Sequence, residues 1–231
     1  MNLNTLRTKQ YGIWQVSRSF PDIVFTRQQQ LLLESSVRFI SYQKGETICK
    51  QNTSVAHIVL IQSGLAKLVL EGYGAKSFIV RFLSDNSFTG YQMLSSEENY
   101  PFSVIAILPV EAILIQRDVF ATILNENKAF NDFTNTLYKA DFTNMVTKIA
   151  MLTTKNMIGR VAEMLLYFNN ENNASIYNHI TRKEMADFAG MSVEGMLKIL
   201  QELKHEKIIQ ILGKRITIND LQTMQKLSII G

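Results

Sequence analysis

Residues 181–200, with the sequence TRKEMADFAGMSVEGMLKIL, place hydroxyl, lysine and carboxylate side chains near the starts of two predicted helices. Thr181 and Glu184 have the spacing of a capping box, in which the hydroxyl and the carboxylate satisfy the free N–H groups of a helix start. Gly190 can adopt the left-handed conformation that ends this helix, and Ser192 can cap a second one. Such a pair of helices is suited to contacting a DNA groove.

The apolar residues of this stretch predict that the two helices cross and pack together. Small or apolar side chains stand where the helices would face each other, namely Met185, Ala186, Ala189, Met191, Met196 and Ile199. Two helices joined by a turn without a DNA role would also have apolar facing positions. They have less reason to combine a small residue and a turn glycine at this spacing, so the pattern favours a helix-turn-helix that binds DNA.

The segment that follows, KIIQILGKRITIND at 207–220, predicts a two-stranded wing beside these helices. A tight turn at Gly213 and Lys214 would separate its two strands. Lys214 and Arg215 would then lie at the hairpin tip, where they are well placed for phosphates. Considered alone, a solvated basic turn explains these two residues about equally well.

The residues before the helix-turn-helix predict a β-rich domain followed by helices. Residues 39–117 contain short runs of Val, Ile, Phe, Leu and Tyr that are interrupted by Gly, Asn, Asp and Ser, which is an all-β pattern. After Arg117 the chain has no Gly or Pro across more than thirty residues, which favours a long helix. A further helix is predicted from Asn156 to Phe168, before a polar loop.

The long helix has an apolar stripe with two possible partners. The stripe comprises Phe130, Phe133, Leu137, Phe142, Met145, Ile149 and Leu152, with the polar residues Asn135, Lys139, Thr143 and Lys148 between them. It could pack on the β-rich domain or pair with the same helix of a second subunit. The length of the helix favours the dimer, because a helix this long usually outruns a single small domain.

The composition of the 231-residue chain indicates a folded protein with two cores of modest size, since 46% of its residues are hydrophobic and 19% are charged. Its net charge of +4 is compatible with nucleic-acid binding but does not establish it. No apolar run is long enough to span a membrane, and the first residues lack the apolar core of a secretory signal. A cytoplasmic location is therefore expected.

The sequence offers no residue set for a metal, a cofactor or catalysis. The single cysteine, Cys49, cannot form an internal disulfide or supply a metal-ligand set, and we expect it to be a buried small residue. The three histidines, at positions 57, 179 and 205, are scattered. No nucleophile, base and orienting group can be nominated together, so we expect neither enzyme activity nor a cofactor. A cupin-type enzyme is disfavoured because it would need a histidine-rich metal site.

Along nearly its full length the chain resembles the Crp/Fnr superfamily of bacterial transcription regulators. The most specific match is ITRKEMADFAGMSVEGMLKILQELKHEKIIQILGKRITI, and YQKGETICKQ, IVLIQSGLAKL and FLSDNSFTG resemble the family's β-roll turns. The resemblance implies an α+β fold with an N-terminal helical segment and a cyclic-nucleotide-binding-like jelly roll at 1–127. A long dimerisation helix at 128–154 and a winged helix-turn-helix at 155–231 would follow. It further implies a homodimer on a palindromic operator in double-stranded DNA and contacts with RNA polymerase.

The resemblance also assigns roles to single residues. Thr181, Lys183 and Ser192 take the positions of phosphate contacts, while Val193, Glu194 and Lys198 take those of base contacts. Many family members carry an Arg at the position of Val193 that can grip guanine, so a guanine preference at this step is not expected. Gly195 lowers helix propensity, which suggests either close approach to DNA or weakened recognition.

The sensor-like part departs from the members that bind cyclic AMP. Tyr91 replaces their ribose-binding Glu, Pro101 and Phe102 replace the phosphate-binding Arg and its neighbour, and Met145 and Val146 replace a hydroxyl-bearing pair. We therefore do not expect cyclic AMP to be the effector, because a buried phosphate needs donors or cations. An unknown, less polar effector could bind near Tyr91, Phe102 and Met145, or control could lie in protein abundance. The rival function is a small-molecule sensor whose helix-turn-helix contacts protein instead of DNA.

Overall fold

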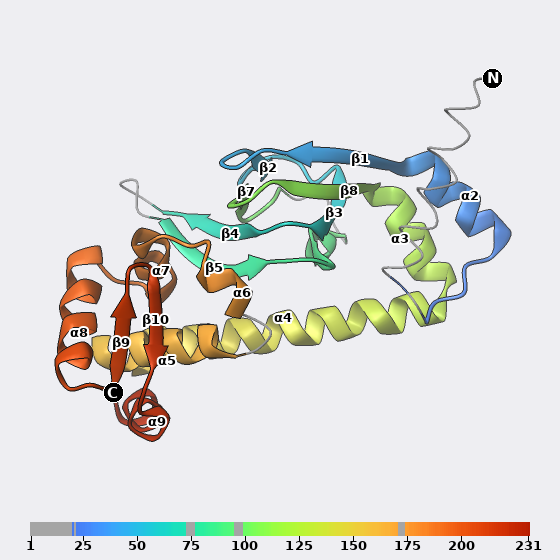
Figure 1. The fold of residues 1–231 in the computed structure, drawn as a ribbon. Coiled ribbons are helices and arrows are strands. Elements are labelled where there is room, and N and C mark those ends of the chain that lie inside the picture. The colour runs from blue at the N-terminus through green and yellow to red at the C-terminus, as the bar shows by residue number, and fades with distance from the viewer. Residues whose placement is uncertain (1–19, 21, 73–76, 95–98, 171–173) are drawn as a thin grey trace. The chain divides into compact units, whose positions relative to one another are not determined.

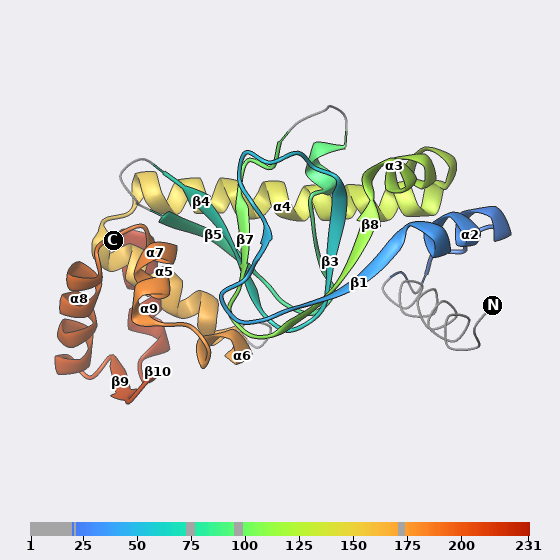
Figure 2. The same cartoon turned by 90° about the horizontal axis from the view of Figure 1, so that it is seen from above.

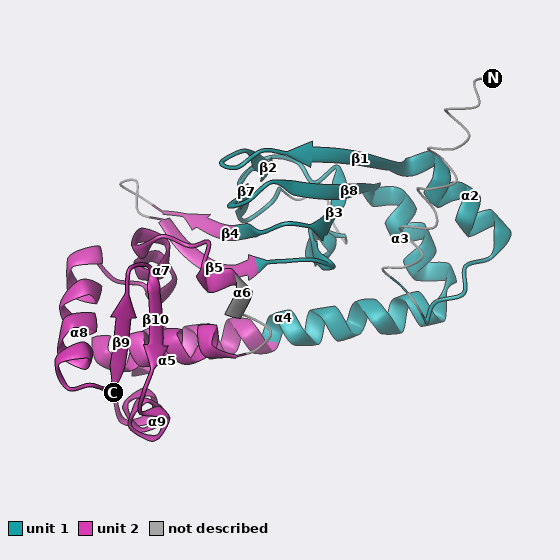
Figure 3. Cartoon of the chain, in the orientation of Figure 1, with its two compact units in different colours: residues 1–67, 83–142 teal, residues 68–82, 143–231 magenta. Residues whose placement is uncertain are grey.

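The computed structural model describes residues 20, 22–72, 77–94, 99–170 and 174–231 (Figure 1). The chain divides into two compact units, of which unit 1 comprises residues 1–67 and 83–142 and unit 2 comprises residues 68–82 and 143–231 (Figure 3). None of the helices in the described ranges is long and apolar enough to cross a membrane.

The strands of the β-rich part lie between Val37 and Gln116, which confirms the all-β pattern. In unit 1, β1 (Val37–Tyr42), β8 (Val110–Gln116), β3 (His57–Ser63) and β6 (Ser87–Thr89) form an antiparallel sheet in that order. The central strand β8 pairs Ile115 with Val37 on one side and with Ile58 on the other. A second antiparallel pair joins β2 (Thr47–Cys49) to β7 (Ser103–Ala106). Most of β4 (Ala66–Glu71) and β5 (Ser77–Leu83) belongs to unit 2.

Aromatic and aliphatic side chains from strands and helices fill the core of unit 1. The core includes Phe20, Phe25, Leu33, Ile58, Leu60, Phe88, Tyr91, Ile113, Ile115, Phe120, Ile123 and Phe130. The ring of Phe20 meets those of Phe88 and Phe130, with centroid distances of 5.1 Å in both cases. The helix α2 (Arg27–Ser36), which a capping box at Thr26 starts, contributes Leu33 to this core. Next to Gly90, Tyr91–Met93 form the short 3-10 helix η2.

The segment after Arg117 forms two helices, α3 (Arg117–Glu126) and α4 (Lys128–Thr154), where the sequence pattern indicated one long helix. Asn127 separates them because its backbone is extended and its side chain caps α4 by accepting from the N–H of Phe130 at 3.1 Å. The Asn127 amide also donates to the carbonyl of Val24 at 3.0 Å. Helix α4 itself is unbroken in both views (Figures 1 and 2).

The apolar stripe of α4 changes its environment along the helix. Phe130 is buried in the core of unit 1, whereas Phe142, Met145 and Ile149 are 70%, 54% and 54% exposed. The expectation that Lys148 is one of the solvated polar residues between the apolar ones is wrong, because Lys148 is only 8% exposed. Phe188 packs over its ammonium group, as the contacts of α7 below explain.

The C-terminal part of unit 2 consists of helices and one hairpin. Asn156 caps α5 (Met157–Asn169) by accepting from the N–H of Gly159 at 3.0 Å. The short helix α6 (Ala174–Tyr177) leads to α7 (Arg182–Ala189) and α8 (Val193–His205). Strands β9 (Ile209–Leu212) and β10 (Arg215–Ile218) pair antiparallel, and α9 (Leu221–Ile230) follows them. The sequence analysis had assigned no element to α6 or α9.

Candidate nucleic-acid interface

The start of α7 is fixed by the predicted capping box. The N–H of Glu184 donates to Thr181 Oγ1 at 3.2 Å, and the N–H of Thr181 donates to Glu184 Oε2 at 2.7 Å. The Thr181 hydroxyl also donates to Glu184 Oε2 at 2.9 Å. Two N–H groups that a helix start leaves free are thus satisfied reciprocally, which confirms the prediction from spacing.

The turn between α7 and α8 requires glycine at position 190. Gly190 has φ 64° and ψ 44°, the left-handed conformation predicted for it. A Cβ atom there would lie 2.5 Å from Cδ2 of Leu152, a distance that real Cβ contacts do not show. After the turn, Ser192 caps α8 by accepting from the N–H of Gly195 at 3.1 Å, as predicted.

Buried side chains hold the two helices together. Of the six predicted facing residues, five are buried, namely Met185, Ala186, Ala189, Met196 and Ile199. Met191 in the turn is half-buried. This packing leaves the opposite side of α8 exposed to solvent.

The exposed side of α8 carries two of the three predicted base contacts. Glu194 and Lys198 are exposed, while Val193 is half-buried. Leu197, which the sequence analysis did not select, is 41% exposed between them. The surface therefore combines an acid, a base and apolar atoms that can meet a thymine methyl group.

Gly195 has a local reason for its small size. A Cβ atom at this position would lie 3.2 Å from the Oγ atom of Ser192, which is the cap of the same helix. Glycine therefore leaves room for the capping hydroxyl as well as for any approaching DNA backbone.

The predicted phosphate contacts on the helix-turn-helix lie at the surface and already have intramolecular partners. Thr181 and Ser192 use their hydroxyls as helix caps. Lys183 pairs with Asp187 at 2.9 Å, and its side chain is 69% exposed. An exposed ion pair of this kind contributes at most about 1 kcal/mol, so Lys183 can exchange the carboxylate for a phosphate at small cost.

The wing forms as predicted, with Leu212 opposite Arg215 and the turn at Gly213 and Lys214. Lys214 and Arg215 are both exposed at this tip. The sequence analysis missed the residue that holds the turn, which is Arg182 of α7. Its Nη2 donates to the carbonyls of Lys214 at 3.0 Å and of Gly213 at 3.4 Å. Arg182 stands in the quoted ITRKE motif, but only the fold reveals its partner.

The proposed effector residues are not joined by contacts within unit 1. The Tyr91 hydroxyl donates to Asp141 Oδ2 at 2.5 Å, and its carbonyl accepts from the Tyr138 hydroxyl at 2.6 Å. Tyr91 is 1% exposed, so a ligand could reach it only by displacing these partners. Phe102 is buried and its ring packs near that of Tyr100. Met145 lies in unit 2 and is exposed.

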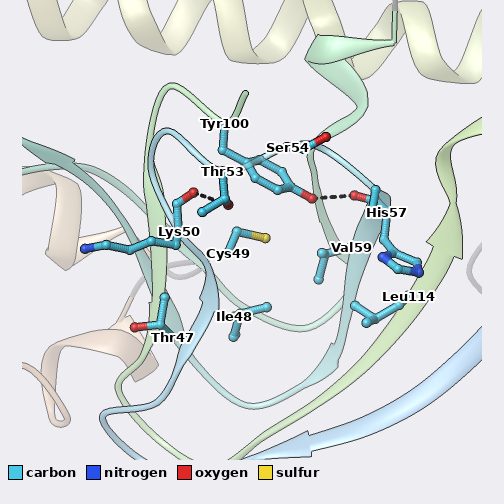
Figure 4. Close-up of a pocket in the computed structure, with 11 residues that line it drawn as sticks. Thr47, Ile48, Cys49, Lys50, Thr53, Ser54, His57, Val59, Tyr100 and Leu114 are labelled. Atoms are coloured by element: carbon cyan, nitrogen blue, oxygen red, sulfur yellow. Dashed lines mark hydrogen bonds between the residues drawn. The ribbon is translucent and has the colours of Figure 1, made fainter. Parts of the chain in front are cut away.

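A cavity of about 430 Å³ in unit 1 contains the cysteine (Figure 4). Cys49 is buried, as predicted, and burial raises the pKa of its thiol to about 12. At neutral pH the sulfur is therefore protonated and a poor nucleophile. The Tyr100 hydroxyl beside it donates to the carbonyl of His57 at 2.6 Å. Burial also lowers the pKa of the His57 side chain, which favours its neutral form.

Comparisons with known families cover about two thirds of the chain. Residues 39–127 match the cyclic nucleotide-binding domain, and residues 159–227 match the Crp-like helix-turn-helix domain. No protein with a curated description matches the chain.

Solved structures share the fold at low sequence identity. FixK2 from Bradyrhizobium japonicum is 18% identical with a TM-score of 0.72, and the match covers 83% of this chain and 96% of that one. The c-di-GMP responsive global regulator CLP from Xanthomonas campestris is 14% identical with a TM-score of 0.69, over 84% and 99% of the two chains. A CRP/FNR family transcriptional regulator from Thermus thermophilus is 17% identical with a TM-score of 0.65, over 83% and 98%.

Proposed function

We propose that this chain, which belongs to the Crp/Fnr superfamily, is a sequence-specific DNA-binding transcription regulator without catalytic activity. The observation that carries the proposal is the α7–α8 pair, whose two caps and buried contact leave Glu194, Leu197 and Lys198 on the open side. A rigid frame with an exposed polar helix face is what direct reading of a major groove requires.

The residues around this helix supply phosphate contacts. Thr181, Lys183 and Ser192 would fix the register of the helix pair on the backbone, and Lys214 and Arg215 would do so from the wing. Contacts of this type add affinity that is independent of sequence and falls with salt. Glu194 in the first turn of α8 is the exception, because its carboxylate would repel a phosphate there and suits a base edge such as cytosine N4.

The chain would act as a homodimer through α4. Phe142, Met145, Val146 and Ile149 are spaced three or four residues apart and are 49% to 70% exposed, so they form an apolar seam on one side of the helix. A second copy of α4 would bury this seam. Two recognition helices related by a two-fold axis would then read a palindromic operator whose half-sites are about 34 Å apart. We also propose that the bound dimer contacts RNA polymerase.

Cyclic AMP would not control this protein. The position that resembles a ribose-binding Glu holds Tyr91, and its hydroxyl is already bonded to the carboxylate of Asp141. Pro101 and Phe102 supply neither the cation nor the donor that a buried phosphate needs. We retain a jelly-roll domain at 1–127, a dimerisation helix at 128–154 and a DNA-binding domain at 155–231 as the proposed division, with a cytoplasmic location. A less polar effector near Tyr91, Phe102 and Met145 stays a prediction.

The test is the selection of bound duplexes from a random DNA pool by the purified chain without added ligand. We expect a two-fold symmetric motif, and we expect affinity for that motif to fall by about 10³-fold between 50 and 200 mM salt if six or more phosphates are contacted. The rival is a sensor whose helix-turn-helix contacts protein. Active, dimeric chain that enriches no duplex at low salt would favour that rival.

A further inference from the structure

A cavity of about 170 Å³ lies within unit 2, bordered by α4, β5, α5 and α7. Its charged side chains come from three of these elements: Lys148 from α4, Arg81 from β5 and Glu163 from α5. The rings of Tyr167 and Phe188 form part of its apolar wall. None of the residues nominated for DNA or effector binding lines this cavity, so the functions considered above leave it unexplained.

Lys148 is the most unusual group at the cavity, because its ammonium is buried without a carboxylate in contact. Its Nζ donates to the carbonyl of Phe188 at 2.5 Å and lies 3.0 Å from the centroid of the Phe188 ring. The ring of Phe78 lies on another side, with its centroid 5.2 Å away. No ion pair of Lys148 occurs among the described residues. A backbone dipole and two ring faces stabilise a cation less than an anion would.

Burial therefore affects the protonation of Lys148. It lowers the pKa of the ammonium to about 7, and the charge of Glu163 offsets part of this effect. The protein thus keeps this lysine close to the point at which it loses its proton in neutral solution. An anion beside Nζ would restore the charge, because a buried cation is stable when it is paired.

The other charged groups around Lys148 leave the cavity with excess positive charge. Glu163 of α5 is already paired with Lys155, and Arg81 of β5 adds a further cation. Tyr167 of α5 is neutral, since burial raises the pKa of its hydroxyl.

On α7, the acidic residue next to Phe188 is likewise engaged. Asp187 pairs with Lys183 and accepts from the Ser77 hydroxyl at 3.4 Å. No acidic group at this cavity is therefore left without a cationic partner among those described, and the balance of charge favours an anionic ligand.

We propose that this cavity binds a small carboxylate, with Lys148 and Arg81 as its cationic partners. The volume equals that of about six water molecules, which limits the ligand to a size between acetate and benzoate. Tyr167 and Phe188 would pack against the apolar part of the ligand, while Asn144 and Thr147 offer further polar atoms at the edge.

A ligand at this place would contact both α4 and the last turn of α7. If the proposed DNA binding holds, the carboxylate would alter operator affinity to the extent that it binds the DNA-bound and free forms differently. The binding site itself does not depend on DNA binding, so the two proposals can be tested separately.

The experiment is calorimetric titration of acetate, butyrate and benzoate into the full chain at several pH values. We expect saturable binding of at least one of them with one site per chain, accompanied by proton uptake near pH 7. Above the pKa of Lys148, binding must first protonate the amine, so affinity should fall as pH rises, by up to about tenfold per pH unit. Benzamide, which is close to benzoate in shape but uncharged, should not bind.

The variants separate the site from nonspecific effects. Lys148→Met removes the charge and keeps most of the apolar chain, and we expect it to weaken carboxylate binding at least tenfold. Lys139→Met, which changes an exposed lysine of the same helix, should leave the affinity unchanged. Arg81→Gln provides a second variant if Lys148→Met does not fold, and it should weaken binding severalfold.

Several results would overturn the carboxylate site. These are no binding of any of the three carboxylates, equal binding of benzamide, equal affinity in Lys148→Met, or an affinity independent of pH. Operator selection without carboxylate distinguishes the two proposals. A chain that selects an operator and binds no carboxylate loses only this site, whereas one that binds carboxylate and no duplex loses only the proposed function.

Discussion

Gly190→Ala should destabilise the helix-turn-helix strongly, because two separate costs meet at this residue. Its φ of 64° lies in the left-handed region, where an L-residue with a Cβ atom costs about 1–2 kcal/mol. The new Cβ would also lie 2.5 Å from Cδ2 of Leu152, and relieving such overpacking costs about 1–3 kcal/mol more. We therefore expect a loss of about 2–5 kcal/mol in the free energy of unfolding of unit 2.

The matched control is Gly213→Ala in the wing turn. Gly213 has a similar φ of 59°, but nothing lies within 4 Å of the position its Cβ would take. This variant should lose only the conformational part, about 1–2 kcal/mol. Urea denaturation, with hydrogen exchange of the α7 and α8 amides to localise the effect, measures both variants. Equal losses in the two variants would refute the contact between Leu152 and the turn.

Three further predictions concern the reading surface, the buried tyrosine and the buried lysine. In the duplex selection, Lys198→Ala should change base preference while Lys214→Ala weakens all sequences alike; equal loss on every sequence from the first change would remove Lys198 from the base contacts. Tyr91→Phe should lower thermal stability by about 1–2 kcal/mol, since it deletes the buried hydrogen bond to Asp141; an unchanged melting temperature would contradict this. The pKa of Lys148 is lowered in the fold, so the unfolded chain binds more protons above pH 7, and stability should rise with pH by about 1 kcal/mol per unit between pH 7.5 and 9. Lys148→Met should lack this rise, and a parallel pH profile in the two proteins would show that the amine is not buried in solution.

The features that sequence reasoning captured are those determined by neighbouring residues. The capping box at Thr181 and Glu184, the left-handed Gly190, the Ser192 cap and the wing turn each depend on residues a few positions apart. Backbone hydrogen-bonding needs decide such features locally, so residue type and spacing suffice to predict them.

The features that sequence reasoning missed depend on residues brought together by the fold. Asn127 interrupts the helical segment by reaching Val24, about a hundred positions earlier in the chain. Lys148 looks like a solvated residue on its own helix, and only the arrival of Phe188 from α7 buries it. Arg182 finds its partners in the wing turn, about thirty residues later. Helical periodicity describes one element at a time, and it cannot supply the second element in any of these contacts.

The reading surface of α8 implies that operator recognition would rest on many weak contacts. Val193 and Leu197 can meet only apolar atoms of bases, and no arginine is present to form a two-bond contact with guanine, which is worth about 1–3 kcal/mol. Glu194 and Lys198 remain as hydrogen-bonding groups on the exposed face. With so little discrimination per helix, specificity would have to come from two half-sites held at a fixed spacing. The exposed seam of α4 provides a surface for such pairing, so the dimer would matter more to sequence selection here than in relatives that carry the arginine.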